Sequence, residues 1–346
     1  MRRRQAVAAA FLWCAAAGAA QRATGARHGA PPGKAYGRRG DVLAAARSIA
    51  AEHALDTRWV EATLAQARFV PVVAQLIVPS ATPAARDWHA YRARFVDPRR
   101  VDAGVRWWRD NEWWLSLAEE RYGVPAEIVV GIVGVETYYG RLTGTFRVLD
   151  ALATLSFDFP RGRSDRSGFF RSELGQFLRL VGREGWDPAA VLGSYAGAMG
   201  LPQFMPSSVL NYAIDFDEDG RVDLTGSPAD VIGSIAYFLA EHGWRRTMPT
   251  HYAVEPPTDI TDRALMLVPD IWPSFSPAQM VERGARLDET GARHEGSLAL
   301  IELSNGDGSP SYVAGTQNFY ALTRYNASSY YALAVIELGR AVATAR

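Results

Sequence analysis

The chain has little cysteine, no excess of charge of either sign and no apolar run long enough to cross a membrane. Cys14 is the only thiol among 346 residues, and Lys plus Arg and Asp plus Glu both number 37. A balanced charge gives no indication of binding to nucleic acid or to a membrane surface. A lone cysteine excludes an internal disulfide. If the first residues are removed, a Cys nucleophile and a Cys-bound metal are excluded as well.

The first twenty residues predict a secretory signal peptide. Three arginines at positions 2–4 precede an apolar stretch at 6–17 that is too short to span a bilayer, and small residues follow up to Ala20. We therefore expect residues 1–20 to be removed and the mature protein to be periplasmic; the alternative is a buried first helix. A lipid on Cys14 would make an outer-membrane lipoprotein, but bulky Trp13 replaces the small residue expected before a lipidated cysteine.

The rest of the chain is predicted to be mainly helical. Residues 21–40 are rich in Gly, Pro, Ala and Arg and are expected to form a flexible leader. Helical spacing of apolar residues then appears at 41–55, 56–67, 101–123, 124–140, 167–185 and 228–244, with Asp41 as a candidate N-cap and Asp56 as the start of the second helix. Between about 246 and 318 short strands are expected at 251–258, 263–269 and 297–304, and a closing helix covers 327–345. The expected fold class is α+β, mainly α, with a small β-rich insertion.

Glu136 is the strongest candidate for a catalytic side chain. It lies four residues after Ile132 and seven after Val129, so it continues an apolar stripe near the end of a helix. Loss of hydration and the negative end of the helix dipole both raise the pKa of a carboxyl in this place, as a general acid requires. The alternative is a Glu that pairs with Arg141 or Arg147 to secure the helix end.

Four separated motifs occur in order: GVETYYG, LDALATLSFDFPR, SYAGAMGLPQFMPSS and TRYNASSYYALAV. Together they resemble the membrane-bound lytic murein transglycosylase B family. The resemblance runs from about residue 42 to the C-terminus and implies a catalytic region at 41–346 with a lysozyme-like core at about 124–245. It also implies cleavage of the MurNAc–GlcNAc bond of peptidoglycan without water, which leaves a 1,6-anhydro-MurNAc end.

By this resemblance Glu136 is the catalytic residue, first an acid toward the glycosidic oxygen and then a base toward the C6 hydroxyl of the same MurNAc. An internal nucleophile needs no second carboxylate, whereas hydrolytic glycosidases usually have a pair. The motifs contain no obvious second acid. Asp150 and Asp158 are the carboxylates that the sequence alone leaves open as partners.

The resemblance also assigns substrate-binding residues. Ser194 and Gln203 lie in a segment dense in small residues (194–208), which lets a sugar chain approach the backbone; the alternative is a tightly packed loop. The other residues that match family cleft positions are Tyr91, Arg161, Tyr325 and Asn326. The sequence departs from the family pattern directly after Arg161, where residues 162–168 intervene, and this departure affects the role of that arginine.

An acidic segment at 215–223 follows the start of an EF-hand loop. Asp215, Asp217 and Asp219 supply oxygens two residues apart, Gly220 permits the sharp turn, and Arg221 would contribute its carbonyl. Gly226 stands where a standard loop has its bidentate Glu, so Asp230 from the next helix is the expected replacement. The sequence thus predicts a structural Ca²⁺ site, as the resemblance also implies, with a solvated acidic turn as the alternative.

These observations predict an exported enzyme that acts on peptidoglycan glycan strands with Glu136 as its single acid/base and no organic cofactor. A hydrolytic muramidase of the same fold and a non-catalytic murein-binding protein are the alternatives. No nucleic-acid partner and no transmembrane helix in the mature chain are expected.

Overall fold

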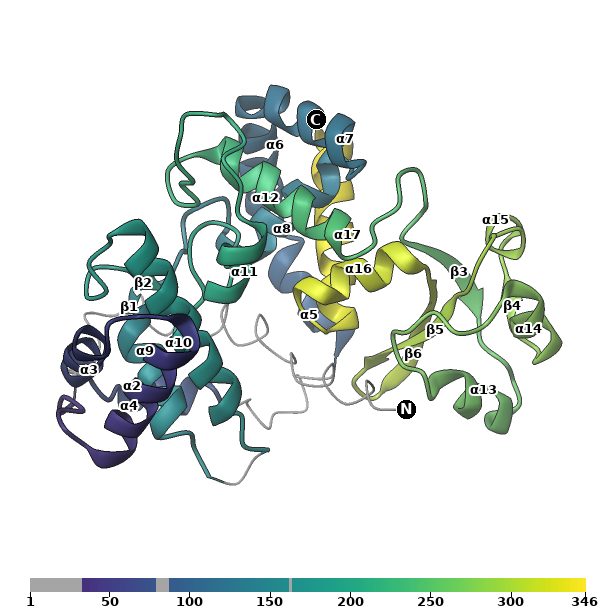
Figure 1. Ribbon diagram of the computed structural model, residues 1–346. Helices are drawn as coiled ribbons and strands as arrows, with labels where there is room; N and C mark the ends of the chain where they lie inside the picture. The colour runs from purple at the N-terminus through teal and green to yellow at the C-terminus, as the bar shows by residue number, and fades with distance from the viewer. Residues whose placement is uncertain (1–32, 79–86, 162–163) are drawn as a thin grey trace. The chain divides into compact units, whose positions relative to one another are not determined.

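The computed structural model describes residues 33–78, 87–161 and 164–346, which form two compact units (Figure 1). The first unit contains the described residues of 33–78 and 136–231, and the second those of 87–135 and 232–346. The divisions fall within two helices, α8 (Ala126–Thr137) and α12 (Pro228–Glu241). The predicted signal peptide and Cys14 lie outside the described residues. Within the described ranges, no helix is both long and apolar enough to cross a membrane.

The first unit is built around α9, a helix whose residues are nearly all buried. Leu149, Leu152 and Leu155 are at most 1% exposed and form a core with α10, which includes Phe170 and Phe177. A short antiparallel pair joins Phe146 to Gly193. The elements are α2 (Gly40–His53), α3 (Thr57–Gln66), α4 (Pro71–Leu76), β1 (Phe146–Arg147), α9 (Val148–Phe157), α10 (Ser167–Glu184), β2 (Leu192–Gly193) and α11 (Pro206–Tyr212).

Two local expectations at the N-terminal side need correction. Residues 33–39 were assigned to a flexible leader, but Tyr36 is 7% exposed, its hydroxyl donates to Asp158 at 2.7 Å, and Ala35 forms a β-bridge with Arg68. A buried aromatic ring and a bridged backbone hold this segment against the first unit. The predicted N-cap at Asp41 is also wrong, because α2 begins at Gly40 and its N-cap is Arg39.

The second unit contains a close contact between α8 and the C-terminal helix. A Cβ on Gly131 would lie 2.2 Å from the carbonyl oxygen of Val335, and one on Gly339 would lie 2.1 Å from that of Glu127. Two glycines therefore let the backbones approach closely. Besides most of α8 and α12, the helices of this unit outside the insertion are α5 (Trp88–Phe95), α6 (Pro98–Asp110), α7 (Glu112–Tyr122), α16 (Gln317–Tyr325) and α17 (Ser329–Ala345).

The helix predicted at 101–123 is two helices. Asn111 separates α6 from α7 with φ −124° and ψ 19°, and its side-chain amide donates to the Trp107 carbonyl at 2.7 Å. An asparagine side chain that bonds to the preceding turn competes with the helical backbone, which explains the break. The sequence pattern did not reveal it because the apolar spacing continues across it.

The insertion forms a four-stranded antiparallel sheet in the order β4-β3-β6-β5, flanked by short helices (Figure 1). The predicted strand at 263–269 is wrong: these residues lie in or just after α13, whose Met266 is fully buried in the insertion's own core. Packing of one helix face overrode the strand-like composition. The elements are β3 (His251–Glu255), α13 (Ile260–Leu267), α14 (Pro277–Glu282), β4 (Arg286–Leu287), α15 (Glu289–Ala292), β5 (Ala299–Asn305) and β6 (Gly308–Gly315).

The two ends of the insertion are fastened at one place. Asn318 is fully buried; its side-chain oxygen accepts from the Arg245 amide at 2.7 Å, and its nitrogen donates to the carbonyls of Arg245 and Met248. The Thr316 amide donates to the Thr250 carbonyl at 3.0 Å. One saturated asparagine thus closes the root of the insertion.

Candidate functional site

Glu136 lies in the last turn of α8, after a run of buried aliphatic side chains. Ile132 and Val133 are fully buried and Val135 is 6% exposed, whereas Glu136 itself is half-buried. Glu136 is thus partly buried and stands at the carbonyl end of a helix, the two conditions on which the sequence argument depends. The position agrees with the apolar stripe in the sequence, and the raised pKa of Glu136 stays a prediction.

The two arginines proposed as alternative partners of Glu136 have contacts of their own. One guanidinium nitrogen of Arg147 lies 3.3 Å from Asp150, and its Nε donates to the Ala189 carbonyl at 3.1 Å. The Arg141 guanidinium lies 4.8 Å from the centre of the Tyr138 ring. Both arginines therefore have a role that does not depend on Glu136.

The backbone directly after α8 adopts a rare conformation. Tyr138, Tyr139 and Gly140 all have positive φ, at 53°, 57° and 84°. For a residue with a side chain the left-handed region is unfavourable, at about 1 kcal/mol or more, and persists only where surrounding bonds impose it. Here the Leu142 amide donates to the Thr137 carbonyl at 2.9 Å and the Gly140 amide to the Thr137 hydroxyl at 3.1 Å. The turn that follows Glu136 is therefore imposed by its hydrogen bonds.

The segment at 194–208 is tightly packed. Ser194 is 8% exposed, and its hydroxyl accepts from the amides of Ala196 and Ala198 at 3.3 and 3.0 Å. A Cβ on Gly197, whose φ is 89°, would lie 2.5 Å from Leu152, so only glycine fits. A tightly packed loop, the alternative that the sequence left open, therefore describes the buried residues of this segment. Since the Ser194 oxygen already accepts twice, its remaining capacity is to donate.

Gln203 uses its amide nitrogen within the protein. This residue is half-buried with φ 52°, and its Nε2 donates to the carbonyls of Gly200 and Thr143 at 2.8 and 3.1 Å. Both amide hydrogens are thereby engaged, so the side chain can offer a ligand only its carbonyl oxygen. A glutamine side chain offers donors as well as an acceptor, and the geometry restricts this one to accepting.

A second hydrogen bond joins the same two segments. The Thr137 hydroxyl, fully buried, donates to the Leu201 carbonyl at 3.2 Å. The turn after Glu136 and the segment at 194–208 are therefore held together by Thr137 on one side and by Gln203 on the other. Sequence reasoning did not single out Thr137, because a threonine beside a candidate acid carries no signal of its own.

The two acids that the sequence left open as partners of Glu136 are engaged by the N-terminal segment. Asp150 is 4% exposed and accepts from the Arg68 amide at 2.9 Å, and burial raises the pKa of its carboxyl. Asp158 accepts from the Tyr36 hydroxyl at 2.7 Å and from Arg39 at 3.1 Å. Both carboxylates fasten residues 33–39 and 68 to α9.

A buried acid that sequence analysis missed lies on α10. Glu173 is 5% exposed and accepts from the Ser207 amide at 3.0 Å and from its hydroxyl at 2.6 Å. Burial raises the pKa of this carboxyl, and the two bonds from Ser207 oppose the rise. Glu173 follows Phe170 by three residues and precedes Phe177 by four, so the apolar-stripe argument used for Glu136 would have selected it too.

The remaining predicted substrate residues are differently placed. Arg161 is exposed in the first unit, beside residues 162–163, which are outside the described residues. In the second unit Tyr91 is 5% exposed, with its ring centre 5.6 Å from that of Tyr330. Tyr325 is half-buried against Phe238 at 5.0 Å, and Asn326 is 6% exposed. The role of Tyr325 and Asn326 beside Glu136 stays a prediction from the family resemblance.

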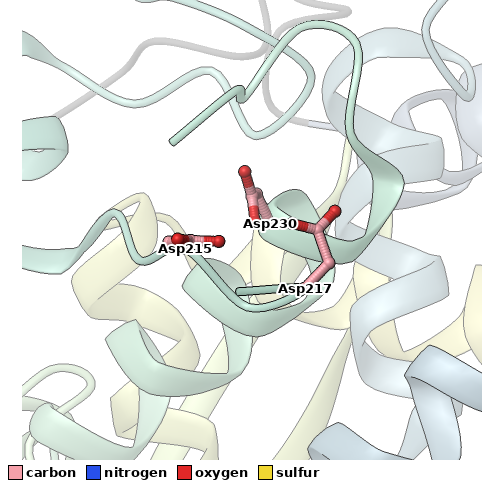
Figure 2. Close-up of side chains that lie close together, drawn as sticks. All are labelled: Asp215, Asp217 and Asp230. Carbon is pink, nitrogen blue, oxygen red and sulfur yellow. The ribbon is translucent and has the colours of Figure 1, made fainter. Parts of the chain in front are cut away.

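Three carboxylates, two from the acidic loop and one from the first turn of α12, lie close together (Figure 2). Asp215, Asp217 and Asp230 each offer an oxygen, and these oxygens all lie within 4.8 Å of one another. Asp217 Oδ1 is buried without a hydrogen-bond partner, whereas its Oδ2 accepts from Ser227. Burial raises the pKa of Asp230, and the two neighbouring carboxylates add to the rise. An orphaned oxygen among three acids is the arrangement that a hard divalent cation would satisfy.

Asp219 and Arg221, the other predicted ligands, lie elsewhere in the loop. Asp219 accepts from the Arg221 amide at 3.0 Å and from its guanidinium at 3.3 Å, and it is outside the group of three converging acids. Asp230 instead accepts from the amides of Phe216 and Asp223 at 2.8 and 2.7 Å. The acid from the following helix thus holds the loop through its backbone, and its role as the ligand that replaces the twelfth-position Glu stays a prediction.

A cavity of about 740 Å³ lies in the first unit beside these segments. Its lining includes Thr143, Met199 and Gly200, residues 221–225 of the acidic loop and its continuation, and residues 180, 183 and 184 of α10. Glu136, Ser194 and Gln203 are not among its lining residues. The cavity therefore does not coincide with these predicted catalytic and substrate-binding residues.

Comparison with known proteins gives a consistent picture. A family model described as a transglycosylase SLT domain matches residues 39–340. The sequence is 39% identical over 309 residues to the membrane-bound lytic murein transglycosylase B of Escherichia coli (strain K12), which covers 85% of this chain and 80% of that protein. The E. coli lytic transglycosylase Slt35 in complex with calcium is 36% identical with a TM-score of 0.78, over 91% of this chain and 96% of that one. SltB3 from Pseudomonas aeruginosa, solved with NAG-anhNAM-pentapeptide, is 28% identical with a TM-score of 0.69, over 86% and 77% of the two chains.

Proposed function

The chain belongs to the transglycosylase SLT domain family and is a peptidoglycan lytic transglycosylase, and we propose that it cleaves the MurNAc–GlcNAc bond without water, with Glu136 as its only acid and base. The match to Slt35 confirms the expected lysozyme-like, mainly α fold with small sheets. One observation carries the mechanistic proposal. A half-buried carboxyl ends an apolar helix, and the turn beyond it is hydrogen-bonded to the small-residue segment.

The proposed reaction has two proton transfers through one carboxyl. Protonated Glu136 donates its proton to the glycosidic oxygen as the bond to C1 of MurNAc breaks, and positive charge develops on the sugar. The C6 hydroxyl of the same MurNAc then attacks C1 and passes its proton to the Glu136 carboxylate. The 1,6-anhydro ring forms, water is not consumed, and the enzyme is returned to its starting state.

The hydrogen bonds of the first unit support a single acid. Asp150 and Asp158 already accept from Arg68, Tyr36 and Arg39, so each has a structural role that a nucleophile or a base for water would have to abandon. Within this proposal Ser194 donates to the glycan and Gln203 accepts from it, since those are the capacities that their protein contacts leave.

We propose further that Asp215, Asp217 and Asp230 hold a structural Ca²⁺. The residues fit the ion, because Asp217 Oδ1 is a buried oxygen without a hydrogen-bond donor and three carboxylates otherwise repel one another. When bound, the cation would supply charge neutralisation and tie the loop to the start of α12. The relative Slt35 is solved in complex with calcium.

Product analysis of murein digested by the purified chain tests the reaction. Anhydro-muropeptides are expected, and these are lighter by one water than the reducing ends that a hydrolytic muramidase releases. The Glu136→Gln variant is expected to lose murein-clearing activity. Glu127→Gln, the same change on the first turn of the same helix, is the matched control and should retain it.

The two alternatives predict different results. Reducing-end products from the unaltered chain would identify a hydrolytic muramidase with a water nucleophile. Binding of murein without any product would identify a non-catalytic binding protein. Undiminished activity of Glu136→Gln would contradict the proposed role of Glu136 in either case.

Export to the periplasm by cleavage after residue 20 is part of the proposal. It rests on the sequence of residues 1–20 and is checked by N-terminal sequencing of the protein recovered from a periplasmic fraction. The glycan strand of peptidoglycan is the proposed partner, and SltB3, solved with a muropeptide carrying an anhydro sugar, is the relative that supports it.

A further inference from the structure

The turn after Glu136 is connected to the small-residue segment through one hydroxyl. Thr137 is fully buried, its Oγ1 donates to the Leu201 carbonyl at 3.2 Å, and the same oxygen accepts from the Gly140 amide at 3.1 Å. A valine of nearly the same shape would break both bonds and leave the buried Leu201 carbonyl and the part-buried Gly140 amide without these partners.

The two backbone segments that this hydroxyl connects both contain residues in the left-handed region. Tyr138 and Tyr139 are held at positive φ directly after Thr137, and Gln203 is held at positive φ two residues after Leu201. Three residues with side chains in the left-handed region thus lie within three positions of the Thr137–Leu201 bond. Backbone held in such conformations at a site indicates a geometry that is being maintained for function.

We propose that Thr137 is a positioning residue for Glu136. Its hydroxyl sets the distance and direction between the carboxyl of Glu136 and the segment at 194–208 that contacts the glycan, so that the acid reaches the glycosidic oxygen. This inference rests on the proposed function of Glu136. It adds a residue that touches neither the sugar nor the transferred proton.

The test compares Thr137→Val with Thr154→Val. Thr154 is also fully buried in the first unit, and its hydroxyl likewise bridges two backbone groups, accepting from the Val70 amide at 3.0 Å and donating to the Arg68 carbonyl at 3.4 Å. Both variants lose a buried bridge of the same kind, and the melting temperature is expected to fall in both. Only Thr137→Val is expected to change the position of Glu136.

For Thr137→Val, kcat is expected to fall by about 10- to 100-fold, because displacement of a catalytic group by even 1 Å has effects of this size, while KM changes little. Thr137→Ser keeps the hydroxyl and should restore most of the loss. Thr154→Val should keep the unaltered kcat. A normal kcat for Thr137→Val, or equal losses in the two valine variants, would overturn the inference.

If Thr137→Val does not fold, hydrogen exchange on the unaltered chain tests the Thr137 bridge on which the inference depends. The Gly140 amide, bonded to a buried hydroxyl, is expected to be strongly protected, and exchange at the rate of an open amide would refute the bridge. A different result would contradict the proposed function. Reducing-end products would remove the lyase mechanism, whereas the comparison of kcat between the valine variants would still test the positioning of Glu136.

Discussion

Replacing Glu173 by glutamine or leucine separates its hydrogen bonds from its charge. The carboxyl is 5% exposed and accepts two bonds from Ser207, at the start of α11. Glutamine keeps both contacts, since its oxygen accepts from the Ser207 amide and its nitrogen donates to the hydroxyl. Leucine loses both and leaves the part-buried Ser207 amide without this acceptor, which should destabilise the fold by about 1–3 kcal/mol.

The difference between Glu173 and glutamine should depend on pH in one direction. Burial raises the pKa of this carboxyl above its ordinary value of 4.5. Below pH 4.5 the acid is protonated in the folded and unfolded chains alike. As pH rises toward the folded-state pKa, only the unfolded chain releases the proton, so the stability of the unaltered protein falls relative to Glu173→Gln. The slope is at most about 1.4 kcal/mol per pH unit, and the difference is constant above the folded-state pKa.

Urea unfolding of the unaltered chain and both variants between about pH 4 and pH 8 measures these effects. Glu184→Gln changes an exposed acid at the end of the same helix and is the control. Its free energy of unfolding should not increase with pH relative to that of the unaltered chain. Parallel stability curves for the unaltered chain and Glu173→Gln would refute the reasoning. A Glu173→Leu variant as stable as Glu173→Gln would show that the bonds to Ser207 contribute nothing.

Two further predictions concern the acidic loop and the helix contact. Chelation of divalent cations with EDTA should lower the melting temperature of the unaltered chain and have less effect on Asp217→Asn, whereas an unchanged melting temperature would contradict the structural role of the ion. Gly131→Ala places a Cβ 2.2 Å from the Val335 carbonyl oxygen and should destabilise the fold by about 1–3 kcal/mol, measured by urea unfolding, while Gly168→Ala, where the added Cβ meets nothing within 4 Å, should not.

Most helices could be located from the sequence because their apolar positions recur at helical spacing and their ends carry recognisable residues. The sequence predicts a helix that starts at Asp56, and α3 begins one residue later, with the Asp56 side chain accepting from the Trp59 amide at 2.7 Å. The failures have tertiary causes. Asn111 divides one apolar pattern into two helices, and α13 forms where the composition suggested a strand, because Met266 enters the core of the insertion.

The candidate site shows the same division. Glu136 could be chosen from its stripe and from the family resemblance, yet Glu173 has the same stripe and lies instead under α11. The spacing of Asp215 and Asp217 predicts a cation site. Gly226 stands where a standard loop has Glu, which suggests Asp230 as the substitute ligand. Only the folded loop shows that Asp219 turns to Arg221 and that one oxygen of Asp217 is left without a donor.

The sequence by itself determined the class of protein, the location of its candidate acid and the presence of an acidic loop, because these depend on residue type and on spacing along one element. The tertiary structure decided which hydrogen-bond donors and acceptors of these and neighbouring residues are already used within the protein. Gln203 is restricted to accepting because its amide nitrogen donates to the Thr143 carbonyl, and Thr137 acquires a role because its hydroxyl donates to the Leu201 carbonyl. Such contacts join residues about sixty positions apart, and no local pattern encodes them because either partner alone has many alternatives.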